Sequence, residues 1–333
     1  MHDGVTIILD NRDLAQSVCG SNDANLKAIE KSLACRVTVR GNELRPVGLD
    51  EKGEGKFKQV MDNLIDLVHN GEIPSPDYVR ALAGAAETEA GAGNMKDSII
   101  SIPHAFSKVF PRSNNQALYI NAIRSCDVNF SVGPAGTGKT FLAIAVALSM
   151  VLSKKIRKLV LTRPVVESGE SLGFLPGDLE QKINPYLRPL HDAMESLIPY
   201  ETIARLEENR LIEIAPLAYM RGRSFNDAFI ILDEAQNTTK EQMKMFLTRL
   251  GNGSRAVITG DITQIDLPKH IESGLLHAIS ILSSIDGIKI TKLYTEDVVR
   301  NPLIKKIIQA YDDAQAEPAF IPVSAKSEGK RGV

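Results

Sequence analysis

The sequence predicts an α/β protein in which a parallel sheet is flanked by helices, with a small α+β unit in front of it. Three apolar segments, residues 128–132, 228–232 and 255–260, have the length of buried strands, and each is followed directly by glycine or aspartate. The first leads into a glycine-rich loop and an amphipathic helix, a connection that suits parallel strands. Strand and helix signals also alternate over residues 1–82, and these predict the smaller unit.

The first 82 residues are expected to fold as strand, helix, turn, helix, two strands and helix. Leu26, Ile29 and Leu33 mark the apolar face of the second helix, and a hairpin is predicted around Gly41-Asn42. The expected elements are residues 4–10, 11–20, 22–33, 35–42, 43–48 and 55–71. This order resembles that of a KH RNA-binding module, so the unit is expected to be a KH-like domain.

The turn between the first two helices departs from the KH pattern. KH domains clamp RNA phosphates with a Gly-x-x-Gly turn, whose glycines let the backbone come close. The corresponding turn here is Gly20-Ser21-Asn22-Asp23, and the Asp23 carboxylate would repel a phosphate. Residues 1–82 also carry 10 basic against 13 acidic side chains. Both RNA contact and a docking or assembly role stay open for this unit, and its charge favours docking.

Composition divides the rest of the chain. Residues 83–98 are rich in Ala, Gly and Glu, lack periodic apolar positions, and are predicted to form a flexible linker. They separate residues 1–82 from a larger domain over residues 99–318. The polar residues 319–333 are predicted to be a disordered tail.

Bulk properties favour an ordinary cytoplasmic protein. No apolar run approaches the ~18 residues of a membrane-spanning helix, so no membrane association is expected. Cys19, Cys35 and Cys126 lie far apart without metal-ligand spacing, which fits thiols in a reducing compartment. The formal charge of −2 gives the whole chain no field that attracts nucleic acid, so any such contact must be local.

The strongest motif is Gly-x-x-x-x-Gly-Lys-Thr at residues 133–140, between an apolar strand and an amphipathic helix. Its glycines expose backbone N–H groups to phosphate at a helix N-terminus. Lys139 is expected to reach the β- and γ-phosphates, and the Thr140 hydroxyl to ligate Mg²⁺. The predicted cofactors are therefore ATP and Mg²⁺. The predicted nucleotide-binding residues are Gly133, Pro134, Ala135, Gly136, Thr137, Gly138, Lys139, Thr140 and, upstream, Gln116.

Two further strands end in groups suited to hydrolysis. Asp233 follows "AFIIL" as a second magnesium contact, and Glu234 is placed to polarise the attacking water. These two are the first residues of the motif Asp-Glu-Ala-Gln, which also occurs in helicases. After the third strand, Asp261 and Gln264 resemble the helicase element Gly-Asp-x-x-Gln, whose Gln senses the γ-phosphate. Gln116 precedes a helix where helicase-type ATPases place a Gln that pairs with adenine.

Together, "GPAGTGKT", "LTRPVVESGESLGFLPGDLEQKINPY", "APLAYMRGRSFNDAFIILDEAQNTT", "TGDITQIDLP" and "DVVRNPL" resemble the PhoH family of P-loop ATPases, almost continuously over residues 99–315. The resemblance implies a RecA-like ATPase core related to superfamily 1 helicases. It also implies links to RNA metabolism, including association with a metal-dependent endonuclease of ribosomal RNA maturation. The KH-like unit is what the longer bacterial members of that family carry.

A superfamily 1 helicase closes its ATP cleft with a second RecA-like core, and the residues after Asp261 are expected to be too few to form one. Residues 255–315 suggest only one more strand, at 288–294, and two helices. The missing half of the cleft is therefore expected from another copy, in a ring-shaped homo-oligomer and most simply a hexamer. Arg300 is the candidate Arg finger that contacts the γ-phosphate in the neighbouring subunit, and Arg221 and Arg223 compete for that role.

Contacts with RNA are expected from a few arginines. Arg163 lies at the carboxyl end of a predicted strand, where ligands collect in open α/β sheets, and Arg221 and Arg223 share a glycine-containing loop. Residues 154–158 form a basic run that is more simply a solvated helix end. Aromatic residues make up 5% of the chain and do not interleave with basic ones, so backbone contacts are expected rather than base stacking.

Three functions compete on this evidence. The first is an ATP-hydrolysing, helicase-like RNA remodeller, favoured by the helicase-like motifs and the KH-like unit. The second is an ATP-gated scaffold that recruits an rRNA-maturation endonuclease without unwinding RNA, favoured by the acidic first unit and its altered turn. The third, a small-molecule kinase, would gain nothing from a glutamate poised for water.

Overall fold

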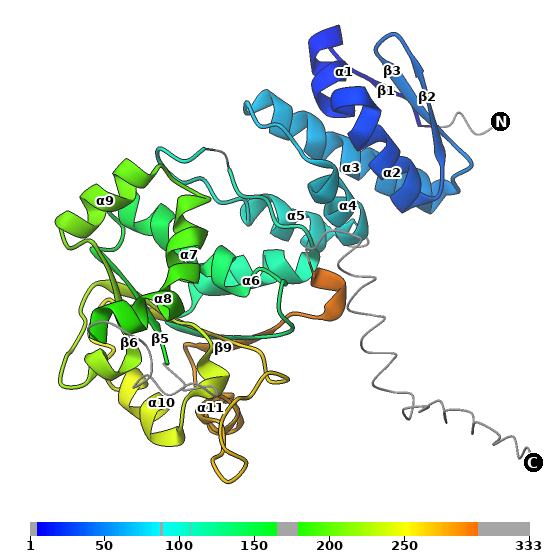
Figure 1. Ribbon diagram of the computed structural model, residues 1–333. Helices are drawn as coiled ribbons and strands as arrows, with labels where there is room; N and C mark the ends of the chain where they lie inside the picture. The colour runs from blue at the N-terminus through cyan, green and yellow to red at the C-terminus, as the bar shows by residue number, and fades with distance from the viewer. Residues whose placement is uncertain (1–4, 87–88, 107, 165–178, 299–333) are drawn as a thin grey trace, which may run out of the picture. The chain divides into compact units, whose positions relative to one another are not determined.

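The computed structural model describes residues 5–86, 89–106, 108–164 and 179–298 (Figure 1). The strands are β1 (Ile7–Ile8), β2 (Arg36–Arg40), β3 (Glu43–Val47), β4 (Val128–Val132), β5 (Lys158–Arg163), β6 (Ile212–Pro216), β7 (Ala228–Leu232), β8 (Arg255–Gly260) and β9 (Ile288–Lys292). The helices are α1 (Arg12–Cys19), α2 (Ala24–Leu33), α3 (Glu51–His69), α4 (Pro76–Ala85), α5 (Glu89–Asp97), α6 (Asn114–Ser125), α7 (Lys139–Leu152), α8 (Leu179–Glu195), α9 (Tyr200–Glu208), α10 (Lys240–Leu247) and α11 (Gly274–Leu282). The expected Arg300 and the expected tail lie outside the described residues.

The element order expected for the first unit is confirmed. Strand β1 is followed by α1, α2, the β2–β3 hairpin and α3, and the three strands form an antiparallel sheet in the order β1-β3-β2. Arg40 pairs with Glu43 across the two-residue turn Gly41-Asn42, and Gly41 has a φ of 66° there. The turn after α1 contains left-handed Asn22 and Asp23 (φ 53° and 58°), a conformation that short polar side chains tolerate.

The predicted linker at residues 83–98 is wrong, because most of this segment is helical. Helix α4 extends to Ala85 and α5 spans Glu89–Asp97. Apolar periodicity is weak here because alanines are small, yet Ala85, Ala86 and Met95 are buried in the core cluster of the first unit. Alanine also has the highest intrinsic helix propensity, so the composition that suggested flexibility stabilises helix instead. Arg124 of α6 donates to the carbonyl oxygen of Ile99 at 2.9 Å, just beyond α5.

The larger domain is built on a six-stranded sheet with the order β6-β5-β7-β8-β4-β9, in which every neighbouring pair is parallel. The predicted fold class, an α/β protein with a RecA-like core, is confirmed. Strand β8 lies between β4, which leads into the phosphate loop, and β7, which ends at Asp233. In register, Val132 lies opposite Gly260 and Leu232 lies opposite Ile258. The carboxyl ends of β4, β8 and β7 therefore meet at one edge of the sheet.

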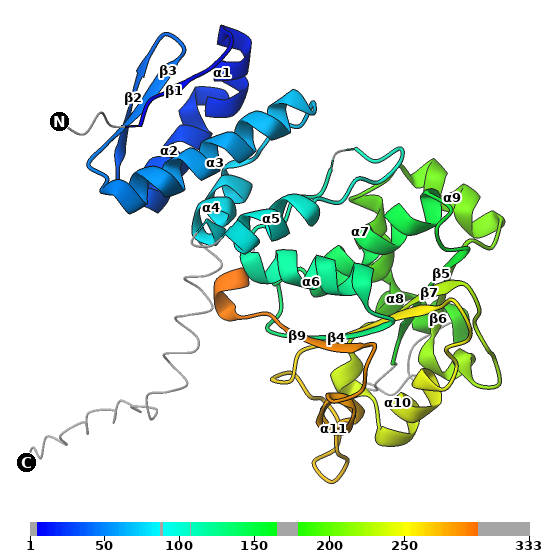
Figure 2. The same cartoon turned by 180° about the vertical axis from the view of Figure 1, so that it is seen from behind.

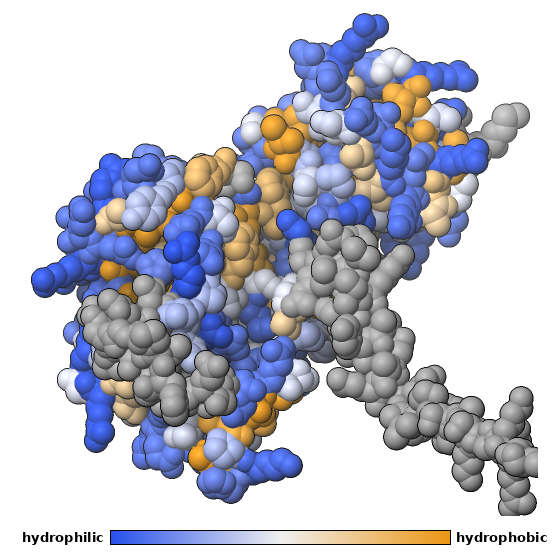
Figure 3. All heavy atoms as spheres, in the orientation of Figure 1, coloured by the Kyte–Doolittle hydropathy of each residue, from blue (hydrophilic) through white to orange (hydrophobic). Residues whose placement is uncertain are grey.

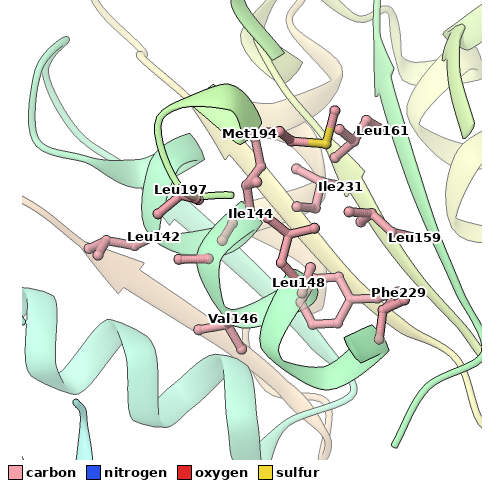
Figure 4. Packing of buried hydrophobic residues seen from close by; sticks show 14 of the residues in the cluster. Leu142, Ile144, Val146, Leu148, Leu159, Leu161, Met194, Leu197, Phe229 and Ile231 are labelled. Atoms are coloured by element: carbon pink, nitrogen blue, oxygen red, sulfur yellow. The ribbon is translucent and has the colours of Figure 1, made fainter. Parts of the chain in front are cut away.

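Helices cover both faces of this sheet, as the two opposed views show (Figures 1 and 2). Alternate residues of β7 enter different cores: Phe229 and Ile231 pack with α7 and α8, whereas Ile230 and Leu232 pack with α10 and α11. Figure 4 shows the first of these cores, where side chains of α7 and α8 meet β5 and β7. Burial on both faces explains why the strands are continuous apolar runs rather than alternating ones.

On the face seen in Figure 3, hydrophilic residues predominate and hydrophobic residues are scattered among them. Within the described ranges, no helix is both long enough and apolar enough to span a bilayer. Scattered exposed apolar residues are normal for a folded domain, so their presence on this face does not indicate a binding site.

Candidate nucleotide site

A cavity of about 250 Å³ opens at the carboxyl edge of the sheet, where β4, β7 and β8 end. It is lined by Ala135, Gly136, Gly138, Lys139, Thr140, Phe141, Asp233, Glu234, Gly260, Asp261 and Gln264. These residues come from three sequence segments, 135–141, 233–234 and 260–264, which the parallel strand order brings together. Most of the residues predicted to bind nucleotide or to act on it therefore lie around one cavity.

The phosphate loop has the backbone that its glycines predict. Gly138 has a φ of 83°, which side-chain-bearing residues rarely adopt, and α7 begins at the next residue. Gly133 is needed for a different reason, since a Cβ there would lie 2.4 Å from the carbonyl oxygen of Leu293, just after β9. The Thr137 hydroxyl donates to the carbonyl oxygen of Pro134 at 2.9 Å and closes the loop on itself.

Lys139 lies inside the phosphate loop with only 9% of its surface exposed. Its Nζ donates to the carbonyl oxygens of Gly133 at 2.6 Å and Pro134 at 2.8 Å. Burial lowers the pKa of Lys139, and attraction to Asp261, Asp233 and Glu234 opposes part of that change. The ammonium is thus held by neutral carbonyls in a cavity that also contains carboxylates. Among the described residues no carboxylate forms an ion pair with it, so a phosphate could supply a charged partner in direct contact.

Thr140 and Asp233 form the predicted metal pair. The Thr140 hydroxyl donates to Asp233 Oδ1 at 2.6 Å, and the Thr259 hydroxyl of β8 donates to the same oxygen at 2.7 Å. A hydroxyl beside a carboxylate supplies the hard oxygen ligands that Mg²⁺ prefers, and phosphate oxygens and water would supply the others. No group of three or more His, Cys, Asp or Glu side chains in the described segments could hold a metal alone. The donor set therefore fits Mg²⁺ that arrives with a nucleotide.

Glu234 lies next to this pair and is held by two donors. Its Oε1 accepts from Arg163 Nη2 at 3.0 Å, and its Oε2 accepts from Gln236 Nε2 at 2.6 Å. Arg163, the expected RNA contact at the end of β5, is thus placed against the expected general base. Its other nitrogen, Nη1, donates to the carbonyl oxygen of Tyr186 on α8 at 3.3 Å.

Asp261 connects the third strand to the phosphate loop. Its Oδ2 accepts from the backbone N–H of Ala135 at 3.1 Å and from Gln264 Nε2 at 2.6 Å, and its Oδ1 accepts from the Thr263 hydroxyl at 2.7 Å. Burial raises the pKa of Asp261, but the hydrogen bonds from Thr263 and Gln264 outweigh burial and lower it below its ordinary value. Gln264, the predicted γ-phosphate sensor, therefore lines the cavity with its amide bound to Asp261.

Gln116 supports the phosphate loop from α6. It is 3% exposed, its Nε2 donates to the carbonyl oxygen of Thr137 at 3.0 Å, and its Oε1 accepts from the backbone N–H of Arg112 at 2.8 Å. A contact with adenine would therefore have to use the second proton of Gln116 Nε2 and the second lone pair of Oε1, or replace these two bonds. The structure places Gln116 beside the loop, and its role toward adenine stays a prediction.

Arg221 and Arg223 lie outside this cavity. Arg221 is exposed, whereas Arg223 Nη2 donates to Glu213 Oε2 on β6 at 2.9 Å, and its guanidinium carbon lies 4.7 Å from the centre of the Phe225 ring. Lys158 also pairs with Glu213. Arg223 thus belongs to a partly buried ion-pair cluster, and its expected roles as RNA contact or finger stay predictions.

Replacing Glu213 by Gln should destabilise the fold by about 1–2 kcal/mol at pH 7, because two cations lose their partner. The hydrogen bond from Arg223, helped by Lys158, outweighs burial and lowers the pKa of Glu213 to about 2. A lowered folded-state pKa contributes stability above the unfolded value, so this contribution should disappear as the pH falls from about 4.5 toward 2. Urea unfolding of the wild type and of Glu213→Gln, at pH 7 and at low pH, measures this contribution to the free energy of unfolding. Glu208→Gln is the control, because Glu208 is exposed. If Glu213→Gln lost the same free energy of unfolding at low pH as at pH 7, the ion pairs of Glu213 would not be the source of this stability.

Gln236 and Thr259 bind carboxylates of the site, although the sequence assigned neither of them a role. Gln236 Nε2 also donates to the carbonyl oxygen of Gln264 at 3.1 Å, and its Oε1 accepts from the backbone N–H of Asp261 at 3.1 Å. Gln236 is the last residue of the Asp-Glu-Ala-Gln motif, and this motif could have indicated its role in the site. Thr259 carried no signal, because its contact with Asp233 depends on β8 lying beside β7.

Comparisons with known proteins show the family to which this chain is similar. A family model described as PhoH-like protein matches residues 108–312. The PhoH-like protein of Mycobacterium tuberculosis (strain ATCC 25618 / H37Rv) is 46% identical over 303 residues, which cover 90% of this chain and 85% of that protein. The PhoH-like protein of Bacillus subtilis (strain 168) is 46% identical over 306 residues, 91% and 96% of the two chains. Protein PhoH of Escherichia coli (strain K12) is 42% identical over 207 residues, 62% and 58% of the chains.

Among solved structures, a Pif1 helicase from Candida albicans is similar at a TM-score of 0.34 and 16% identity. That similarity covers 60% of this chain and 43% of the helicase. It is too weak to support an argument about function.

Proposed function

We propose that this chain, which belongs to the PhoH-like protein family, binds ATP with Mg²⁺, hydrolyses it, and uses hydrolysis for helicase-like remodelling of RNA. The observation that carries the proposal is the 2.6 Å contact between the Thr140 hydroxyl and Asp233, in the cavity that Lys139 also lines. A hydroxyl, a carboxylate and a buried ammonium converge there on the glycine-rich phosphate loop. This arrangement suits a triphosphate and its metal ion.

The residues can divide the chemistry among them. The phosphate-loop N–H groups and Lys139 would hold the β- and γ-phosphates, and Thr140 and Asp233 would hold Mg²⁺, which neutralises phosphate charge when bound. Glu234 would accept a proton from water as the water oxygen bonds to the γ-phosphorus. The bond from that phosphorus to the bridging oxygen of ADP then breaks, which yields ADP and inorganic phosphate.

The test is phosphate release by the purified protein with ATP, in Mg²⁺ or in excess chelator, with and without single-stranded RNA. We expect turnover only with Mg²⁺ and an increase of several-fold with RNA. Because backbone contacts release counterions, that increase should largely vanish between about 50 and 200 mM salt. Absence of turnover in every condition would overturn the proposal, and turnover indifferent to RNA would remove the remodelling part of it.

An ATP-gated scaffold is the second candidate function. The 10 basic and 13 acidic side chains of residues 1–82, and the acidic Asp23 in the turn after α1, favour protein docking over RNA contact there. In this case the chain would recruit an rRNA-maturation endonuclease in one nucleotide state and release it in another. Binding measured in ATP and in ADP separates the candidates, because a remodeller without the scaffold role would bind the nuclease equally in both.

The remaining part of the ATP cleft is proposed to come from a second copy, in a homo-hexameric ring with ATP between subunits. The support is the single parallel sheet of the described residues, which supplies one side of the phosphate site. Arg300, Arg221 and Arg223 are the candidate residues that would reach the neighbouring phosphate. Sedimentation during turnover tests this, and a persistent monomer at full ATPase rate would exclude it.

A further inference from the structure

Arg163 and Glu234 meet across two neighbouring strands at the edge of the cavity. Arg163 ends β5 and Glu234 follows β7 by two residues, and Thr162 lies opposite Leu232 in the register of these strands. The guanidinium is bonded on two sides, to Glu234 Oε1 at 3.0 Å and to the carbonyl oxygen of Tyr186 at 3.3 Å. Arg163 is also mostly buried, with 21% of its side chain exposed. It is therefore built into the site rather than extended from it.

The second oxygen of Glu234 is held by a residue that is itself fixed. Gln236 is 1% exposed and donates to Glu234 Oε2 at 2.6 Å. Its own carbonyl oxygen accepts from the backbone N–H of Asp261, and its amide also donates to the carbonyl oxygen of Gln264. Glu234 is thus held between Arg163, at the end of β5, and Gln236, which is itself bonded to the backbone just after β8.

Two fixed donors define one orientation for a side chain that would otherwise have several. Glu234 has a φ of 50°, a left-handed backbone that is uncommon for residues with side chains, and its side chain is 36% exposed. Without partners, a half-exposed glutamate samples several rotamers. Each carboxylate oxygen has two acceptor positions, so these bonds leave capacity to accept a proton from water.

We propose that Arg163 is a positioning residue for the water-activating carboxylate: its guanidinium holds Glu234 in the one orientation that reaches the attacking water. The inference rests on the proposed hydrolysis, in which Glu234 takes the proton from the water that attacks the γ-phosphorus as ADP leaves. It differs from the role in RNA binding expected for Arg163, because Glu234 and Tyr186 already occupy two of the five N–H donors of the guanidinium and fix its direction.

The test is ATP turnover without RNA for Arg163→Ala and Arg163→Lys. A carboxylate displaced by about 1 Å loses on the order of 10²-fold in rate, so we expect kcat of Arg163→Ala to fall about 10–100-fold with little change in KM. Arg163→Lys keeps one positive donor for Glu234 and should recover part of kcat. Arg188→Ala is the matched control, since Arg188 pairs with Asp192 on the exposed face of α8 and should leave kcat unchanged.

A second measurement separates positioning from a structural role. Arg163→Ala added to Glu234→Gln should cause no further loss of turnover, because a residue that acts only through Glu234 has nothing left to position. ATP affinity and the melting temperature of each variant show whether the fold is intact, and Arg163→Lys serves if Arg163→Ala does not fold.

Several outcomes would overturn the inference. An Arg163→Ala protein with wild-type or higher kcat would overturn it, as would losses that multiply in the double variant. An effect of Arg163→Ala confined to RNA-stimulated turnover would restore the RNA-contact role. A wild-type protein that never hydrolyses ATP would overturn the proposed function as well, so the two failures are distinguishable.

Discussion

Replacing Glu234 by Gln should lower ATP turnover by about 10²–10⁴-fold, the usual contribution of a positioned general base. The amide has nearly the size of the carboxylate, but it cannot accept a proton from water at neutral pH. It also offers one acceptor oxygen where Arg163 and Gln236 now find two. Lys139, Thr140 and Asp233 remain in place, so ATP binding should change by no more than about 3-fold, and the variant should stall with ATP bound.

Single-turnover phosphate release and equilibrium ATP binding, measured on the same preparation, check this result. Glu241→Gln is the matched control, because Glu241 is an exposed glutamate in the first turn of α10 and lies outside the cavity. If Glu234→Gln keeps half or more of the wild-type rate, another group activates the water. If it loses ATP binding along with turnover, Glu234 supports the fold of the site rather than the chemistry.

Replacing Lys139 by Met should weaken ATP binding by about 10²–10³-fold, the effect of removing one partner from a desolvated charge pair. Methionine fills similar space but brings no charge to the phosphates, and it leaves the carbonyl oxygens of Gly133 and Pro134 without their donor. Turnover at moderate ATP concentration should fall by at least the same factor. The melting temperature should fall by a few degrees, because lost hydrogen bonds of this kind contribute about 1 kcal/mol each.

Calorimetric titration with ATP, with Lys155→Met as the control for an exposed lysine after α7, measures the change. The pH dependence gives an independent check. Since burial lowers the pKa of Lys139, its charge should be lost at a lower pH than that of an ordinary lysine. As the pH rises, the ATP affinity of the wild type should therefore begin to decrease at a pH below the ordinary pKa of lysine. The ATP affinity of Lys139→Met should show no such decrease. Equal affinities for Lys139→Met and Lys155→Met would exclude the phosphate contact.

The sheet and the phosphate site were predictable because their signals are local. Residues 133–140 carry a complete motif between a strand and a helix, and Asp233 directly follows a buried apolar strand. Parallel strands end at one edge, so the convergence of these segments with Asp261 followed from three strand assignments. The hairpin at Gly41-Asn42 was similarly fixed by its turn residues.

The parts that were not predictable depend on which strands are neighbours and on which small residues are buried. The partnership of Arg163 with Glu234 requires β5 to lie beside β7, and the Thr259 contact with Asp233 requires β8 on the other side. Sequence order gives neither adjacency. The helix α5 was missed because alanines show little hydropathy contrast between buried and exposed positions, although the segment contains a fully buried Met95.

The two cores on opposite sides of β7 have a consequence for how this protein tolerates change. A residue inserted between Ala228 and Phe229 would send Phe229 and Ile231 toward the space shaped for Ile230 and Leu232, and would carry Asp233 away from Thr140. Swapping one aliphatic residue for another there costs packing, whereas a change in length breaks both hydrophobic layers and the metal pair at once. Among natural variants of this chain, we therefore expect insertions and deletions to be absent from this strand, even where its individual amino acids differ.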